Sequence, residues 1–204
     1  MKRIIFLIAI CLSFVGTASA QFNLSKLLNG LTTEAAKNTE SDPYKRLAES
    51  APASSTLNGK WSYESASFSY IGNNPLAGVV IAQLDPVIED ILKKYNVTKD
   101  SATLTLNNGK ATIAHGEHSV SGTYRYTRST AGIVAEAIID KKSVSAKGYV
   151  RYSSGMLTVM LDIREVMQAI TTVAPEFKSD QNFILVESLL RDIGDVYVVG
   201  KFKK

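Results

Sequence analysis

A tight turn at Asn108-Gly109 constrains the fold of this chain more than any other feature. These two residues are a strong signal for a two-residue β-hairpin. Closing the hairpin there pairs Leu106 with Ala111 and Leu104 with Ile113, which puts apolar residues on one face of the sheet. The turn and the hydrophobic pattern therefore predict the same register.

Two further turns extend this face. Gly116-Glu117 pairs Ile113 with Val120, and Ser154-Gly155 sets Tyr152 against Leu157. Because side chains alternate along a strand, the residues between the apolar positions should face water. The sequence predicts an antiparallel meander with one apolar face.

The expected meander has eight strands, the first from Gly59 to Tyr70 and the last from Asp195 to Lys203. In the first strand the apolar parity switches near Glu64-Ser65, which predicts a bulge. Eight strands with one apolar face can close into an up-and-down barrel, with first and last strands paired. Trp61 would plug one end of it, and Gly59 allows the close backbone approach that this needs.

Helical periodicity interrupts the meander twice. Between the first two strands it runs from Pro75 to Tyr95, and Asp85-Pro86 is interpreted as the restart that makes this a pair of helices. A second pair begins at Asp162, continues in a helix capped by Asp180, and precedes the last strand. The expected fold is therefore mainly β, an eight-stranded antiparallel barrel with two helical pairs.

The pattern Gly59-Lys60-Trp61 followed by this meander resembles the lipocalin and calycin group, and an arginine that usually stacks on the tryptophan has no counterpart near Lys201. The segment from Leu57 to the C-terminus is also similar to a lipocalin-like family of unknown function from Bacteroidetes-type gut bacteria. That resemblance implies a fold and an exported location, and it implies no catalytic residues. The residues that carry it are Asn73-Asn74-Pro75-Leu76-Ala77-Gly78, Leu84-Asp85-Pro86, Tyr95 and Ser121-Gly122-Thr123-Tyr124.

The first residues have the features of a cleaved secretory signal. Lys2 and Arg3 precede an apolar run, and Ala18-Ser19-Ala20 is a small-residue cleavage site. We expect a signal peptide over 1–20, a flexible arm over 21–56 and the barrel domain over 57–204. The mature chain would be periplasmic or secreted, with no transmembrane segment and no cysteine, since Cys11 lies in the signal. It keeps only a small excess of basic residues, so we expect no nucleic-acid partner.

Few residues have a pattern that indicates chemistry. His115 and His118 flank the Gly116-Glu117 turn and are weak candidates for metal ligands, but histidines at a hairpin tip are more often simply exposed. No nucleophile elbow, phosphate-binding glycine loop or paired-carboxylate motif is present. We expect neither a cofactor nor enzymatic activity.

Three functional classes remain open. The first is a carrier or sensor of a small hydrophobic ligand, with the segment from Pro75 to Tyr95 as a lid. The second is a cell-envelope structural, interaction or inhibitor module whose barrel is filled by its own side chains. The third, an outer-membrane barrel, is disfavoured because polar residues recur on the other face. The candidate pocket residues for the first class are Phe68, Tyr70, Leu104, Ile113, Tyr124, Tyr126, Tyr152 and Val159.

Overall fold

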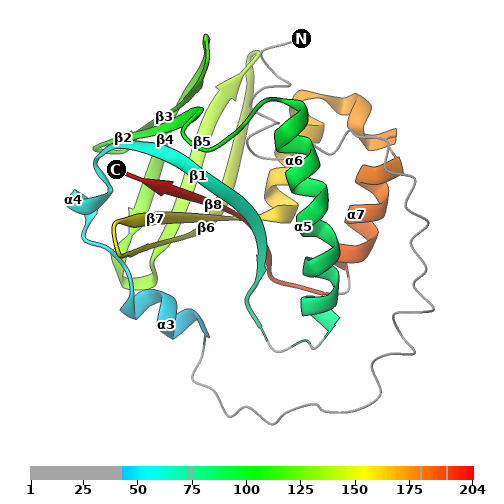
Figure 1. Cartoon of the computed structure of the whole chain (residues 1–204), viewed down its shortest axis with the longest axis horizontal. Helices are drawn as coiled ribbons and strands as arrows, with labels where there is room; N and C mark the ends of the chain where they lie inside the picture. The colour runs from blue at the N-terminus through cyan, green and yellow to red at the C-terminus, as the bar shows by residue number, and fades with distance from the viewer. Residues whose placement is uncertain (1–42, 73, 75, 180, 192) are drawn as a thin grey trace.

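The computed structural model describes residues 43–204 apart from 73, 75, 180 and 192, and strands dominate this part of the chain (Figure 1). Each strand pairs in antiparallel fashion with the next along the chain, and β8 pairs with β1, so the sheet closes into a barrel. This confirms the predicted barrel and its closure. The strands are β1 (Gly59–Tyr70), β2 (Ala102–Asn107), β3 (Lys110–His115), β4 (His118–Thr127), β5 (Gly132–Ile139), β6 (Lys142–Ser153), β7 (Met156–Asp162) and β8 (Val196–Lys203).

The predicted registers are confirmed at all three hairpins. Leu104 lies opposite Ile113, Ile113 opposite Val120, and Tyr152 opposite Leu157. The Asn108-Gly109 turn has positive φ at both residues, as a type I′ turn requires. Short turns of this kind fix register without help from the rest of the fold, which is why it could be predicted locally.

The bulge in β1 is also confirmed, because the pairing with β8 shifts between Tyr63 and Ser65. Glu64, at the bulge, lies 2.6 Å from the Lys99 ammonium and 3.3 Å from that of Lys203. The hydrogen bond from Lys99, together with the nearby Lys203 ammonium, lowers the pKa of the Glu64 carboxyl group and outweighs the rise that burial causes. The bulge thus joins β8 to the segment before β2 through one carboxylate.

One helix, α5 (Leu76–Lys94), stands between β1 and β2, where the sequence predicts two. Pro86 lies inside it, and proline removes only one backbone hydrogen bond of a helix. Asp85 does not cap a new helix; its carboxylate accepts a hydrogen bond of 2.8 Å from the Phe68 backbone N–H. Since β2 pairs with β1 only as far as Ser62, α5 covers the edge that the rest of β1 leaves open.

The helical pair before the last strand is confirmed as α6 (Ile163–Val173) and α7 (Gln181–Arg191), with η2 (Pro175–Ser179) between them. Asp162 caps α6 by accepting hydrogen bonds from the N–H groups of Arg164 and Glu165. The expected cap at Asp180 lies outside the described residues. Figure 1 shows α5, α6 and α7 beside one another at one end of the barrel.

In the described residues before β1 there are two short helices, α3 (Pro43–Glu49) and α4 (Ser54–Leu57). Leu47 of α3 is buried against Met160, Tyr197 and Val199 in a small cluster on the outer face of the barrel. Residues 43–56, which the sequence assigns to the arm, are therefore packed on the barrel. The leucine-rich stretch earlier in that arm and the expected signal peptide lie outside the described residues.

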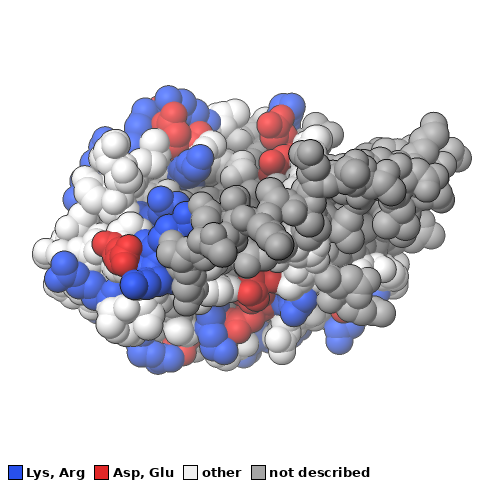
Figure 2. Space-filling view, turned by 90° about the horizontal axis from the view of Figure 1, so that it is seen from below, with Lys and Arg blue, Asp and Glu red and all other residues white. Residues whose placement is uncertain are grey.

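Basic and acidic side chains are interspersed over the described part of the face in Figure 2. Two ion pairs on the surface join neighbouring strands or a strand and a helix, Arg125 with Glu136 and Lys147 with Glu165. Exposed pairs of this kind contribute little to stability, about 0–1 kcal/mol each. Stability must come from the barrel interior, where the larger hydrophobic cluster lies.

Candidate functional site

One end of the barrel is closed by Trp61, which is fully buried. Its indole Nε1 donates a 2.9 Å hydrogen bond to the Leu57 carbonyl, and the Lys204 ammonium lies 4.5 Å from the ring centroid. Tyr152 packs edge-on against it at 6.0 Å between centroids. Gly59, two residues earlier, has φ +137°, a conformation that favours glycine. A ligand therefore has no path through this end among the described residues.

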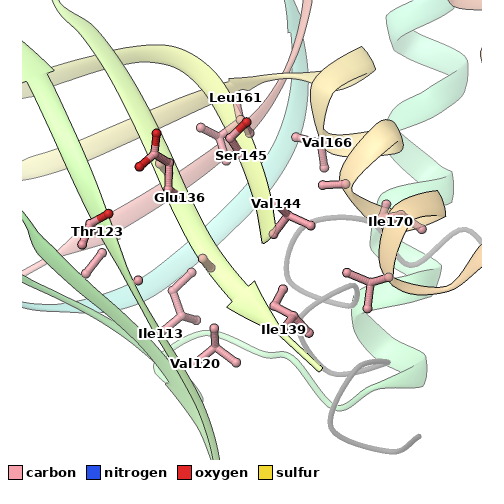
Figure 3. Close-up of a pocket in the computed structure, with 17 residues that line it drawn as sticks. Ile113, Val120, Thr123, Glu136, Ile139, Val144, Ser145, Leu161, Val166 and Ile170 are labelled. Atoms are coloured by element: carbon pink, nitrogen blue, oxygen red, sulfur yellow. The ribbon is translucent and has the colours of Figure 1, made fainter. Parts of the chain in front are cut away.

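The other end holds an apolar chamber of about 160 Å³. Strands β3 to β7 supply most of its wall, and α6 lies across its mouth. In Figure 3, Val166 and Ile170 of α6 face Ile113, Val120 and Ile139 across the space. Because α6 contributes its apolar stripe to this wall, the helix is both a packing element and a cover.

A second chamber of about 120 Å³ lies deeper in the barrel, toward Trp61. Leu106, Tyr124 and Phe202 line it and do not line the first chamber. The residues that line both chambers are Ala111, Ile113, Ala135, Leu161 and Val166. The two chambers share this wall, so they lie next to each other inside the barrel, and together they are called the column.

The column is lined almost entirely by carbon. The one carboxylate among the described lining residues is Glu136, and its Oε1 accepts a 2.8 Å hydrogen bond from Arg125 on the outer face. No lysine, arginine or histidine is among the described lining residues. Among the described residues that line the deeper chamber, Tyr124, which is 9% exposed, is the one with a polar side chain.

Two glycines let neighbouring strands around the column approach each other closely. A Cβ at Gly122 would lie 2.2 Å from the Glu136 carbonyl oxygen, and one at Gly148 would lie 1.7 Å from that of Met160. Both contacts are with backbone, which cannot move aside without opening the strand ladder. These positions need glycine for close approach of neighbouring strands.

Half of the predicted pocket residues reach the column. Leu104, Ile113, Tyr124 and Val159 line one chamber or both. Phe68 is buried in the same hydrophobic cluster but is not among the described lining residues. The alternation along the predicted strands indicated which residues point into the barrel, but not how deep in the barrel each side chain lies.

The other three predicted tyrosines have different surroundings. The Tyr126 hydroxyl donates a 2.8 Å hydrogen bond to the Pro52 carbonyl and so holds the segment between α3 and α4. The Tyr70 hydroxyl accepts a 2.8 Å hydrogen bond from the Asn74 N–H. Tyr152 is 37% exposed and covers Trp61. None of them is among the described lining residues of either chamber.

Most lining residues that the sequence did not predict lie on the strands, and four come from α6, namely Val166, Ala169, Ile170 and Val173. The expected lid was the segment from Pro75 to Tyr95, but none of its described side chains lines the column. The signal that could have found α6 is its apolar stripe, which looks the same whether the helix covers a cavity or a filled core.

His115 and His118 lie directly opposite each other at the tip of the β3–β4 hairpin. The His115 Nε2 atom is 3.1 Å from the Asn96 carbonyl oxygen, so this histidine holds the hairpin tip against the end of α5. In the part of the chain that is described, no three histidine, cysteine, aspartate or glutamate side chains gather as a metal site would need.

Two larger hollows lie outside the barrel interior. One of about 370 Å³ lies between α3 and the barrel, with Arg46 and Arg151 in its wall, and one of about 590 Å³ lies between α6 and α7, with Arg164, Lys178 and Glu187. Their walls carry charged side chains that water can solvate. The column differs from both in being apolar and in lying within the barrel.

This geometry can be compared with known proteins. The family described as "Lipocalin-like domain (DUF4923)" matches residues 31–204. The chain belongs to this lipocalin-like family. The match begins within the predicted arm, before α3.

Other comparisons add little to this membership. A search of curated proteins found no match to this lipocalin-like chain. It is similar to a solved Schistosoma mansoni fatty acid binding protein in complex with arachidonic acid, at 11% identity and a TM-score of 0.30, over 75% of this chain and 98% of that chain. A TM-score that low carries no argument about a ligand. None of the helices in the described ranges has both the length and the hydropathy needed to cross a membrane.

Proposed function

We propose that this lipocalin-like protein is an exported, non-enzymatic carrier or sensor that binds a small hydrophobic molecule inside its barrel. The observation that carries the proposal is the apolar column, closed at Trp61 and bordered at its mouth by α6. An apolar cavity of about 150 Å³ stays dry and accepts a guest such as benzene, and the outer chamber alone has that size. Lys2, Arg3 and the Ala18-Ser19-Ala20 site support export.

A second candidate is an envelope interaction module with a self-filled barrel. The observation in its favour is that each chamber is smaller than the roughly 300 Å³ of an ordinary ligand pocket. The two candidates differ in whether the space between Ala135 and its neighbours is available to a guest.

Ala135, in the wall common to both chambers, offers a test. If the column is open, Ala135→Leu fills it, so affinity for the neutral fluorophore prodan should fall at least about tenfold. Stability should stay level or rise by up to about 2 kcal/mol, at about 0.8 kcal/mol per buried methylene. If the barrel is self-filled, the same change overpacks it and costs about 1–3 kcal/mol.

The matched control is Ala114→Leu in β3. Ala114 alternates with the inward-facing Ile113, pairs with Ser119 and lines neither chamber. The control variant should leave prodan affinity unchanged. The enthalpy of prodan binding to the wild type should become more negative as the temperature rises, because burial of apolar surface gives a negative heat-capacity change. Absence of binding to wild type, together with destabilisation by Ala135→Leu, would favour the self-filled module.

A further inference from the structure

The deeper chamber contains a hydrogen-bonding group that the protein does not use. Tyr124 lines it, and its hydroxyl has no hydrogen-bond partner among the described residues. The hydroxyl oxygen is reachable by a water-sized molecule, since it is not one of the fully buried side-chain atoms without a partner among the described residues. Polar groups inside proteins nearly always bond to protein or to water. The neighbouring inward tyrosine shows the usual arrangement, since the Tyr126 hydroxyl donates to the Pro52 carbonyl. The free hydroxyl of Tyr124 is therefore available to a ligand.

The same column offers nothing that would neutralise a charge. Its described walls hold no cationic side chain, and its one carboxylate is paired with Arg125 on the outside. Moving an ionised group into such a site without a partner costs several kcal/mol. At the rim, the Lys142 ammonium donates a 3.1 Å hydrogen bond to the carbonyl of Val173, which lines the outer chamber.

The shape of the column suggests the form of the guest. The outer chamber has about the size that holds one aromatic ring, and the deeper one is smaller and has Tyr124 in its wall. A guest with a bulky apolar end and a slim chain fills both chambers. Its chain end then lies beside the tyrosine hydroxyl.

We infer that the ligand is an uncharged, elongated apolar molecule with a single hydroxyl or carbonyl oxygen, bound with that oxygen at Tyr124 and its apolar end beneath α6. This inference rests on the proposed function. An anionic lipid with its headgroup at the rim near Lys142 is the competing arrangement, and the test separates the two.

Three ligands with one carbon skeleton provide the test: phenylbutanol, phenylbutyrate and butylbenzene, titrated into the full protein at about pH 8. Phenylbutanol should bind about three- to tenfold more tightly than butylbenzene, because one hydrogen bond contributes about 0.5–1.5 kcal/mol. It should bind at least about tenfold more tightly than the ionised phenylbutyrate. Tyr124→Phe should remove the advantage over butylbenzene and leave butylbenzene unchanged.

The control is Tyr126→Phe, which removes a hydroxyl from the same strand outside the column and should not change the ranking of the three ligands. If phenylbutyrate binds as tightly as phenylbutanol or more so, the inference is overturned and the proposed function stands. If Tyr124→Phe weakens all three equally, Tyr124 is only a wall and the inference is again overturned. If none of the three binds, the proposed function itself fails.

Discussion

Replacing Gly148 with alanine should destabilise the barrel where β6 pairs with β7. The new Cβ would lie 1.7 Å from the Met160 carbonyl oxygen and 2.9 Å from the Leu161 Cα, both of them backbone atoms. To relieve this contact, the two strands must separate by more than about 1 Å, which breaks ladder hydrogen bonds beside the Gly148–Leu161 pair. Two lost bonds at about 1 kcal/mol each, with about 1–3 kcal/mol of repacking, give a loss of about 3–5 kcal/mol.

Urea unfolding followed by circular dichroism measures this loss, and the midpoint of thermal unfolding should fall by roughly 6–20 °C for a domain of this size. Gly78→Ala is the matched control, since Gly78 lies in α5 with no atom within 4 Å of its would-be Cβ. It should stabilise the protein by about 0.5–1 kcal/mol, because glycine is a poor helix former. If Gly148→Ala changes stability by less than about 1 kcal/mol, the close approach of these strands is wrong.

Three further predictions follow from other contacts. Leu47→Ala should cost about 2–4 kcal/mol by urea unfolding, because Leu47 is buried against Met160 and Tyr197, and a loss below about 0.5 kcal/mol would mean that α3 is dispensable. Burial raises the pKa of Tyr63 to about 12, so its contribution to stability should be fully present below about pH 10 and fall by about 2 kcal/mol as pH rises to 12; because burial also raises the pKa of Tyr197 to about 12, Tyr63→Phe should make the decline smaller by about 2 kcal/mol and not abolish it, and an equal decline in the variant would contradict the assignment. Lys142→Met removes the contact with the Val173 carbonyl that holds α6 to the β5–β6 hairpin, so stopped-flow measurements should show faster prodan association and release, whereas Lys141→Met should not, and unchanged rates in both would mean that α6 does not gate the column.

The barrel could be predicted because its determinants are local. The turns at Asn108-Gly109 and Ser154-Gly155 fix register within a few residues, and strand parity then decides which side chains face inward. The bulge beside Glu64 was visible for the same reason, as a change of parity. Such features need no knowledge of distant segments.

Features that depend on distant segments could not be predicted. Asp85 looked like a helix cap, but its carboxylate bonds to the Phe68 N–H across the fold, so α5 continues through Pro86. The cation over Trp61 is Lys204, three residues after Lys201, and that a lysine there could take the place of the usual arginine is not visible from the sequence. The strand pattern does not tell which segment outside the strands contacts a given strand residue.

The candidate site, too, could be predicted only where local features determine it. Inward parity identified Leu104, Ile113, Tyr124 and Val159, but tyrosine spacing could not distinguish the free hydroxyl of Tyr124 from one that is already used. The hydroxyl of Tyr126 bonds to Pro52, 74 residues earlier in the chain. The cover of the column likewise depends on how α6 packs after β7, which its stripe does not specify.

The central claim is that the barrel interior accepts an apolar guest, and a crystal of the protein pressurised with xenon tests it most directly. Xenon enters dry apolar cavities of about 150 Å³ and is located by its anomalous scattering. The account predicts xenon in the outer chamber, bounded by Val120, Ile139 and Ile170. A barrel whose interior takes up no xenon because side chains occupy the space between these three residues would contradict it.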